Sequence, residues 1–288
     1  MIASTDFSRS LSQIFTNPVF REVAQSGTSD YILTKIKKYQ HQLLAEPGLP
    51  VRKVIENAYG YLGRNYRNEY VYKNTIINNI LLGRHSVNTA TLLNELKVGG
   101  SIADTVIING TSTVYEIKTE LDNPAKLEKQ LDDYRKAFVK VYLVTHYSLT
   151  ERYLSLIKDK PVGLLSLSGR FNLTSVKPAS EDYNGLDTDI MMKTLRKDEY
   201  CAVIKGYFGC LPEVSTIRFF SECLRLAKEI EPRTLHEMML TQLKKRVPCD
   251  SQSLASTTIP REIKHICLCI DPSRAEYNNL ANFLNHNI

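Results

Sequence analysis

Two stretches of alternating residues, separated by an Asn-Gly step, constrain the fold of this chain more than any other feature. Residues 102–108 read IADTVII and residues 113–118 read TVYEIK. Apolar residues at every second position are typical of β-strands. The dipeptide Asn109-Gly110 between them is typical of a tight hairpin turn. We therefore expect two antiparallel strands joined by a short loop.

The length of this loop decides which charged side chains meet. Because side chains alternate along a strand, Glu116 and Lys118 project from the same face. A three-residue loop pairs Ile108 with Ser112, Val106 with Val114 and Asp104 with Glu116. A two-residue loop instead sets Asp104 opposite Tyr115, and the sequence leaves both registers open.

The first register brings two carboxylates together beside an ammonium group. Opposed like charges destabilise a hairpin unless a cation lies between them. Mg²⁺ takes oxygen ligands and keeps several of its waters, so Asp104 and Glu116 suit it. Lys118 could then orient or activate an attacking water, or neutralise a developing phosphate charge.

Further elements flank the hairpin in a definite order. An apolar stripe predicts a helix over 69–82, and residues 92–97 are the candidate for a strand before Asp104. After Lys118, Asn123 and Pro124 form a helix start, and residues 139–145 are apolar enough for a central strand. The expected order is therefore αβββαβ.

Asp104, followed after a hairpin by Glu116-Ile117-Lys118, resembles the PD-(D/E)XK, or restriction-endonuclease-like, nuclease superfamily. The resemblance covers about residues 70–167, and Ala103 stands where the superfamily usually has Pro. It implies an α/β fold with a restriction-endonuclease-like αβββαβ core. It also implies that Asp104 and Glu116 bind the catalytic metal and that Lys118 assists the hydrolytic water.

The resemblance extends to further candidate residues. One branch of the superfamily carries a Gln on the helix after the motif, here Gln130, which would orient Lys118 or the water, with Tyr134 one turn on as a substrate contact. Some relatives use an additional carboxylate as a metal ligand, for which Glu95 and Glu69 compete. The implied cofactor is Mg²⁺, for which Mn²⁺ can substitute.

Other substrate contacts are suggested by position alone. Ser101 follows two glycines in a loop that leads into the Asp104 strand, so its hydroxyl could approach a phosphate. Lys244 and Lys245 end a predicted helix, where they favour the helix dipole and could contact nucleic acid.

The chain is expected to divide into three parts. Residues 1–65 form a helical arm with helices over 7–44 and 51–62, and residues 66–178 form the nuclease-like core. A hairpin over 162–176 extends the sheet of that core. The remaining residues, 179–288, form a helical C-terminal domain, with helices expected at 188–195, 197–208, 215–229, 232–246 and from 273 onward.

Charge, hydrophobic runs and cysteine spacing limit the compartment and the partners expected for this protein. The formal charge of +6 and pI of about 8.9 permit a polyanionic partner without requiring one. No run of about 20 apolar residues predicts a membrane span, and residues 1–13 lack the features of a secretion signal. The six cysteines lack zinc-like spacing. We therefore expect a cytoplasmic protein with reduced, mostly buried thiols and no membrane partner.

The leading hypothesis is a Mg²⁺-dependent endo- or exodeoxyribonuclease that hydrolyses phosphodiester bonds in nucleic acid, with DNA expected first. Restriction, repair and anti-phage defence all use such cores. The alternative is a catalytically silent nucleic-acid-binding or protein-docking module, in which the helical C-terminal region contacts a partner protein or a second copy of the chain. A third interpretation is an unrelated α/β protein in which Glu116 and Lys118 form a solvent-facing salt bridge.

Overall fold

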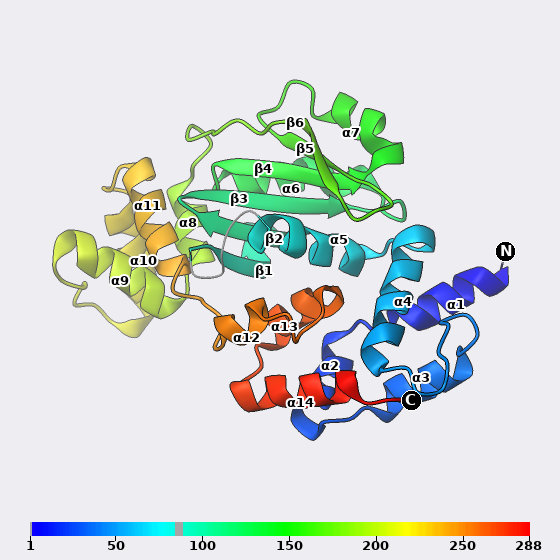
Figure 1. Cartoon of the computed structure of the whole chain (residues 1–288). Helices are drawn as coiled ribbons and strands as arrows, with labels where there is room; N and C mark the ends of the chain where they lie inside the picture. The colour runs from blue at the N-terminus through cyan, green and yellow to red at the C-terminus, as the bar shows by residue number, and fades with distance from the viewer. Residues whose placement is uncertain (1, 84–88) are drawn as a thin grey trace. The chain divides into compact units, whose positions relative to one another are not determined.

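The computed structural model describes residues 2–83 and 89–288 (Figure 1). The chain forms two compact units. Unit 1 comprises Met1–Val87, Leu167–Leu173 and Pro248–Ile288, and unit 2 comprises Asn88–Ser166 and Thr174–Val247. The protein is therefore mixed α/β, and each unit is described separately below.

Unit 2 is built on an open sheet of six strands in the order of the sequence (Figure 1). The first three strands pair antiparallel, and β3 pairs parallel with β4. The expected hairpin after residue 162 extends this sheet, and its tip belongs to unit 1. The strands are β1 (Thr91–Val98), β2 (Ser101–Asn109), β3 (Thr111–Lys118), β4 (Lys140–His146), β5 (Gly163–Leu167) and β6 (Leu173–Lys177).

The register between β2 and β3 is the one that brings the carboxylates together. Val106 pairs with Val114, and Ile108 pairs with Ser112. This confirms the register of the three-residue loop and excludes the alternative. The chain reverses at Gly110, whose φ of 69° is a left-handed conformation that glycine adopts without strain.

The parallel pairing of β3 with β4 requires a crossover, which a short helical segment provides. A 3₁₀ turn, η2 (Pro124–Lys126), leads into α6 (Leu127–Arg135). Asn123 Oδ1 accepts a hydrogen bond from the amide of Ala125 at 3.0 Å, which confirms the predicted helix start. Helix α6 packs against β2 and β4 and buries Leu127, Leu131 and Tyr134. One face of the sheet is thereby covered.

The helices that follow the sheet in unit 2 share its core. Met191 and Met192 of α8 lie in one apolar cluster with Leu93 and Val106 of the sheet. Residues up to 247 are therefore part of the sheet unit, whereas the sequence placed them in a separate domain from residue 179 onward. The helices are α7 (Thr150–Leu156), preceded by the 3₁₀ turn η3 (Tyr147–Leu149), α8 (Thr188–Thr194), α9 (Lys197–Phe208), α10 (Thr216–Ala227) and α11 (Pro232–Leu243).

A buried histidine in α11 makes the stability of unit 2 depend on pH. His236 Nε2 lies 3.0 Å from Ser112 Oγ, and burial lowers the pKa of His236 to about 4. The imidazole of His236 therefore binds a proton in the unfolded chain as the pH falls below about 6.5, whereas in the folded chain it stays neutral down to about pH 4. This difference destabilises the fold at acidic pH. We expect a loss of about 2–3 kcal/mol between pH 6.5 and pH 4.5, measured by urea unfolding. A His236→Gln variant should lack this pH-dependent drop in the free energy of unfolding, whereas a variant at the exposed His41 should retain it.

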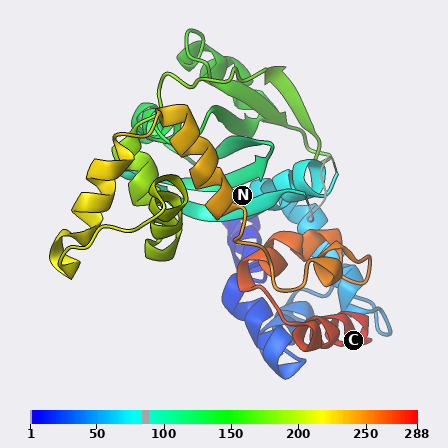
Figure 2. The same cartoon turned by 90° about the vertical axis from the view of Figure 1, so that its left-hand side faces the viewer.

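Unit 1 joins the two ends of the chain. Helix α14 (Arg274–Asn285) lies against α2 (Asn17–Ser26) (Figure 2). Asn279 Nδ2 donates to the carbonyl of Ala24 at 2.8 Å. The other helices of this unit are α1 (Ile2–Ser12), α3 (Asp30–Lys38), α4 (Val51–Asn65), α5 (Glu69–Ile76), the π-helix η1 (Ile77–Leu81), α12 (Ser251–Ala255), the 3₁₀ turn η4 (Arg261–Ile263) and α13 (Lys264–Ile270).

The region 7–44, expected to be helical, contains three separate helices, α1, α2 and α3. Helix α2 ends at Gly27, which is left-handed with a φ of 76°. Ser29 then caps α3 by accepting a hydrogen bond from the amide of Ile32. Both are ordinary helix boundary signals.

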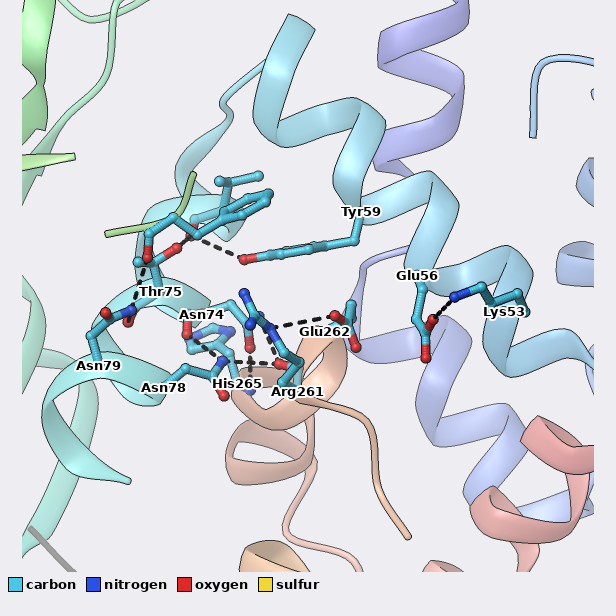
Figure 3. Close-up of polar contacts among 12 residues, drawn as sticks. Lys53, Glu56, Tyr59, Asn74, Thr75, Asn78, Asn79, Arg261, Glu262 and His265 are labelled. Atoms are coloured by element: carbon cyan, nitrogen blue, oxygen red, sulfur yellow. Dashed lines mark hydrogen bonds and ion pairs between the residues drawn. The ribbon is translucent and has the colours of Figure 1, made fainter. Parts of the chain in front are cut away.

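Asparagine side chains attach the C-terminal segment to α5 (Figure 3). Asn74 Nδ2 donates to the carbonyl of Arg261 at 2.9 Å, and Asn74 Oδ1 accepts from the amide of His265 at 3.0 Å. Asn78 Nδ2 contacts the same carbonyl of Arg261 at 2.9 Å. These bonds explain why α5 and η1 group with residues 248–288, so the boundaries expected after residues 65 and 178 differ from the observed ones.

Gly63 of α4 leaves room for the ring of Phe171. A Cβ at Gly63 would lie 1.9 Å from Phe171 Cζ, and this ring stacks on Tyr59 with centroids 4.8 Å apart. We expect Gly63→Ala to destabilise the protein by about 1–3 kcal/mol in urea unfolding. Gly60→Ala on the same helix meets only the Arg64 side chain at 3.5 Å and should be neutral or stabilising. Equal effects at Gly60 and Gly63 would contradict this packing.

No helix among the described residues is long and apolar enough to cross a bilayer. The cysteines are free thiols, with Cys223 and Cys267 buried and Cys210 and Cys249 exposed. The expectation of mostly buried thiols is therefore met only in part.

Candidate functional site

Strands β2 and β3 separate next to Asp104. Their ladder ends at the pair Thr105 and Tyr115, and the next pair in this register is Asp104 with Glu116. Asp104 Oδ2 accepts a hydrogen bond of 2.7 Å from the amide of Ile117. The half-buried carboxylate thus binds a backbone amide at the point where the ladder stops.

Glu116 is buried, and both of its oxygens are bound. Its side chain is 1% exposed. Oε1 lies 2.7 Å from Lys118 Nζ, and Oε2 lies 2.7 Å from the hydroxyl of Tyr134. The ion pair of Glu116 with Lys118 is therefore an interior pair, which argues against the interpretation as a solvent-facing salt bridge.

Lys118 joins the strand carboxylate to the crossover helix. Its Nζ donates to Gln130 Oε1 at 2.9 Å as well as to Glu116, and its side chain is 11% exposed. Thr145 Oγ1 on β4 donates to the carbonyl of Lys118 at 2.8 Å. Sequence reasoning missed Thr145, although the parallel pairing of β3 with β4 places it beside Lys118.

Tyr134 holds Glu116 from α6. Its hydroxyl lies 2.7 Å from both Glu116 Oε2 and the carbonyl oxygen of Ile102. Burial, followed by the nearby charges of Glu116 and Asp104, raises the pKa of Tyr134 far above its ordinary value. The phenol is therefore neutral, and its single proton is available to one of the two oxygens. The hydrogen bond to Glu116 places Tyr134 in this cluster, where the sequence expected a substrate contact.

Glu95 occupies the position next to Asp104 on β1. The pairs Asn94 with Thr105 and Leu96 with Ala103 flank Glu95 and Asp104, which form no pair themselves. The exposed Glu95 has a φ of 52°, a left-handed conformation that is unfavourable for a residue with a Cβ. Three acidic residues thus occupy neighbouring register positions on β1, β2 and β3.

The remaining candidates have other partners. Glu69 belongs to unit 1 and pairs with Lys73 at 2.5 Å. Ser101 Oγ donates to Asp133 Oδ2 at 2.7 Å, so this hydroxyl ties the β1–β2 turn to α6. Lys244 and Lys245 are exposed after α11.

The backbone of Lys244 fixes its place along the sheet. Its carbonyl accepts a hydrogen bond from Thr91 Oγ1 at 3.0 Å, and Thr91 pairs with Ile108. Ile108 is four residues along β2 from Asp104, which corresponds to about 13 Å. Lys244 and Lys245 are thus separated from the carboxylate cluster within unit 2.

The carboxylates of the site determine which kind of metal ion it could hold. Within the described parts of the chain, no group of three or more His, Cys, Asp or Glu side chains could hold a metal. Asp104 and Glu116 supply a pair of carboxylates, and Mg²⁺ sites in proteins commonly use one or two carboxylates with waters filling the other positions. The residues present therefore fit Mg²⁺ better than a metal that needs a complete protein cage.

Fold and site define a mixed α/β protein with a buried carboxylate, lysine, glutamine and tyrosine cluster on its sheet. Residues 63–268 match the family model described as Bacteriophage P4 protein cII, which is more than half of the chain. The chain belongs to this family.

Two other comparisons were less informative. No match was found among the curated proteins. A solved structure of a protein of unknown function from Silicibacter pomeroyi is 18% identical, with a TM-score of 0.27. The similarity covers 33% of this chain and 63% of that one, which is less than two thirds of its length. A likeness of this size supports no conclusion about fold or function.

Proposed function

We propose that this protein is a metal-dependent nuclease with a restriction-endonuclease-like core, and that it hydrolyses phosphodiester bonds in DNA. The observation that carries the proposal is the position of Lys118 Nζ, 2.7 Å from Glu116 Oε1 and 2.9 Å from Gln130 Oε1, beside the Asp104 position. The order of three antiparallel strands, crossover helix and parallel fourth strand supports it.

Each side chain has a role in this proposal. Asp104 and Glu116 would hold Mg²⁺, and Glu95 is the better placed of the two additional candidates because it adjoins Asp104 in the register. The ion, when bound, polarises the scissile phosphate and lowers the pKa of the attacking water. Lys118 orients that water or offsets the extra negative charge of the transition state.

Gln130 and Tyr134 support these groups from α6. Gln130 fixes the Lys118 ammonium group through Oε1, and Tyr134 fixes the Glu116 carboxylate through its hydroxyl. Precise placement matters because catalysis of phosphoryl transfer rests largely on positioning and electrostatic stabilisation. Because Gln130 and Tyr134 lie one turn apart on the same helix, their contacts with Lys118 and Glu116 keep a fixed geometry.

The experiment that tests the function is incubation of the purified protein with a panel of single- and double-stranded DNA and RNA. We expect cleavage of DNA with Mg²⁺ or Mn²⁺, none with a chelator, and none by the Asp104→Asn variant. Asn retains an oxygen that can accept from the Ile117 amide, so this variant removes the charge while keeping the bond. Full activity of Asp104→Asn would refute the proposal, and metal-independent binding without cleavage would favour the silent module.

A further inference from the structure

A second concentration of charged groups lies in unit 1, outside the proposed nuclease site. A pocket of about 510 Å³ lies between α4 and the segment 255–264. Its charged lining residues are Arg52, Glu56, Arg261, Glu262 and Lys264. Figure 3 shows Glu56 on α4 and Glu262 on η4 close to one another. The volume falls within the range of small-molecule sites in proteins.

The basic groups of the pocket include a buried donor without an acceptor. A terminal nitrogen of Arg52 donates to the carbonyl of Thr258, whereas Arg52 Nε is buried with no hydrogen-bond partner among the described residues. Leaving a buried N–H unsatisfied is unfavourable, so such a group calls for an explanation. The Arg261 side chain is 61% exposed, and its Nε lies 3.5 Å from Glu262 Oε1.

Lys264 reinforces the positive side of the pocket. It is buried, and its Nζ donates to the carbonyls of Leu254 and Ser256. Burial lowers the pKa of Lys264 to about 8. A buried ammonium group with a lowered pKa beside a pocket is typical of a functional site.

The acidic residues of the pocket, Glu56 and Glu262, provide hydrogen-bond acceptors. Glu262 is 9% exposed, and burial, assisted by the charge of Glu56, raises its pKa. Glu56 pairs with Lys53 at 2.8 Å. These carboxyl groups accept hydrogen bonds from hydroxyl or amino groups and would repel a simple anion that filled the whole pocket.

We propose that this pocket binds a nucleotide, with its phosphate at Arg52 and Arg261 and its hydroxyl or amino donors at Glu56 and Glu262. A nucleotide carries both an anionic group and several hydrogen-bond donors, which matches a pocket lined by three basic and two acidic side chains. Neither Asp104 nor Glu116 lines this pocket, so the proposal stands whether or not the protein is a nuclease.

Calorimetric titration of the full chain with AMP, adenosine and inorganic phosphate tests this site. We expect AMP to bind at least about ten-fold more tightly than phosphate or adenosine alone, because only AMP engages both sets of groups. Arg261→Gln should weaken AMP about ten-fold and leave adenosine unchanged, and Glu56→Gln should weaken both AMP and adenosine. Both side chains are partly exposed, so these variants should fold.

Arg64→Gln, an exposed position on the same helix, is the matched control and should bind AMP normally. The absence of AMP binding, equal affinity for phosphate and AMP, or unchanged AMP affinity in Arg261→Gln would each overturn the proposal. A phosphate on a nucleoside occurs both in free nucleotides and at the ends of nucleic-acid strands. A 5′-phosphorylated oligonucleotide distinguishes these two sources. Competition with AMP would assign the site to strand ends, and its failure to compete would assign it to free nucleotides.

Discussion

Replacement of Lys118 by Ala should lower the rate of Mg²⁺-dependent DNA cleavage by about 1,000-fold or more. The ammonium group is the only part of this side chain that contacts both Glu116 and Gln130. In the proposed mechanism, its loss removes the group that orients the attacking water while leaving the Asp104 carboxylate in place. Steady-state cleavage of a labelled duplex by the purified variant measures the effect.

The matched control is Lys129→Ala on α6. Lys129 also forms an ion pair, with Asp133 at 2.7 Å, but its side chain is 65% exposed. We expect this variant to cleave at close to the rate of the unaltered protein. Similar rates for Lys118→Ala and Lys129→Ala would exclude a chemical role for Lys118.

Replacement of Glu116 by Ala should cost about 3–5 kcal/mol of stability, because it leaves the Lys118 ammonium group in the interior without its carboxylate. The Tyr134 hydroxyl also loses its contact with Glu116 Oε2. Urea unfolding of the variant beside the unaltered protein measures this loss. The paired replacement Glu116→Leu with Lys118→Met removes both charges, and we expect it to recover most of the lost stability.

This pair of variants separates stability from function. A buried ion pair often adds little net stability relative to apolar residues of the same volume. The doubly substituted protein should therefore be folded and stable but inactive. A doubly substituted protein as unstable as Glu116→Ala would indicate that Glu116 and Lys118 serve the fold itself.

The parts of the fold that depend on neighbouring residues could be predicted from the sequence. The strands, the Asn123 helix start and the β2–β3 hairpin all rest on local signals, and the structure confirms each. The Asp104 and Glu116 positions follow from this register. The cluster of Lys118 with Gln130 was likewise accessible, since the resemblance named both residues.

Contacts between distant segments could not be predicted in the same way. The hydrogen bonds of Asn74 to Arg261 and His265 join positions 187 and 191 residues apart and leave no periodic signal. The left-handed backbone at Glu95 lies at a single position where the β1–β2 register is interrupted between two paired positions, and a strand pattern does not encode it. The sequence left Glu95 and Glu69 as competing candidates for the additional carboxylate, and the register favours Glu95.

The measurement that tests the central claim most directly is calorimetric titration of Mn²⁺ and Mg²⁺ into the unaltered protein and the Asp104→Asn variant. Two carboxylates at neighbouring positions on β2 and β3 predict ion binding by the unaltered protein and a loss of at least about ten-fold in affinity in the variant. Equal affinity in the two proteins, or no ion bound by either, would contradict the account.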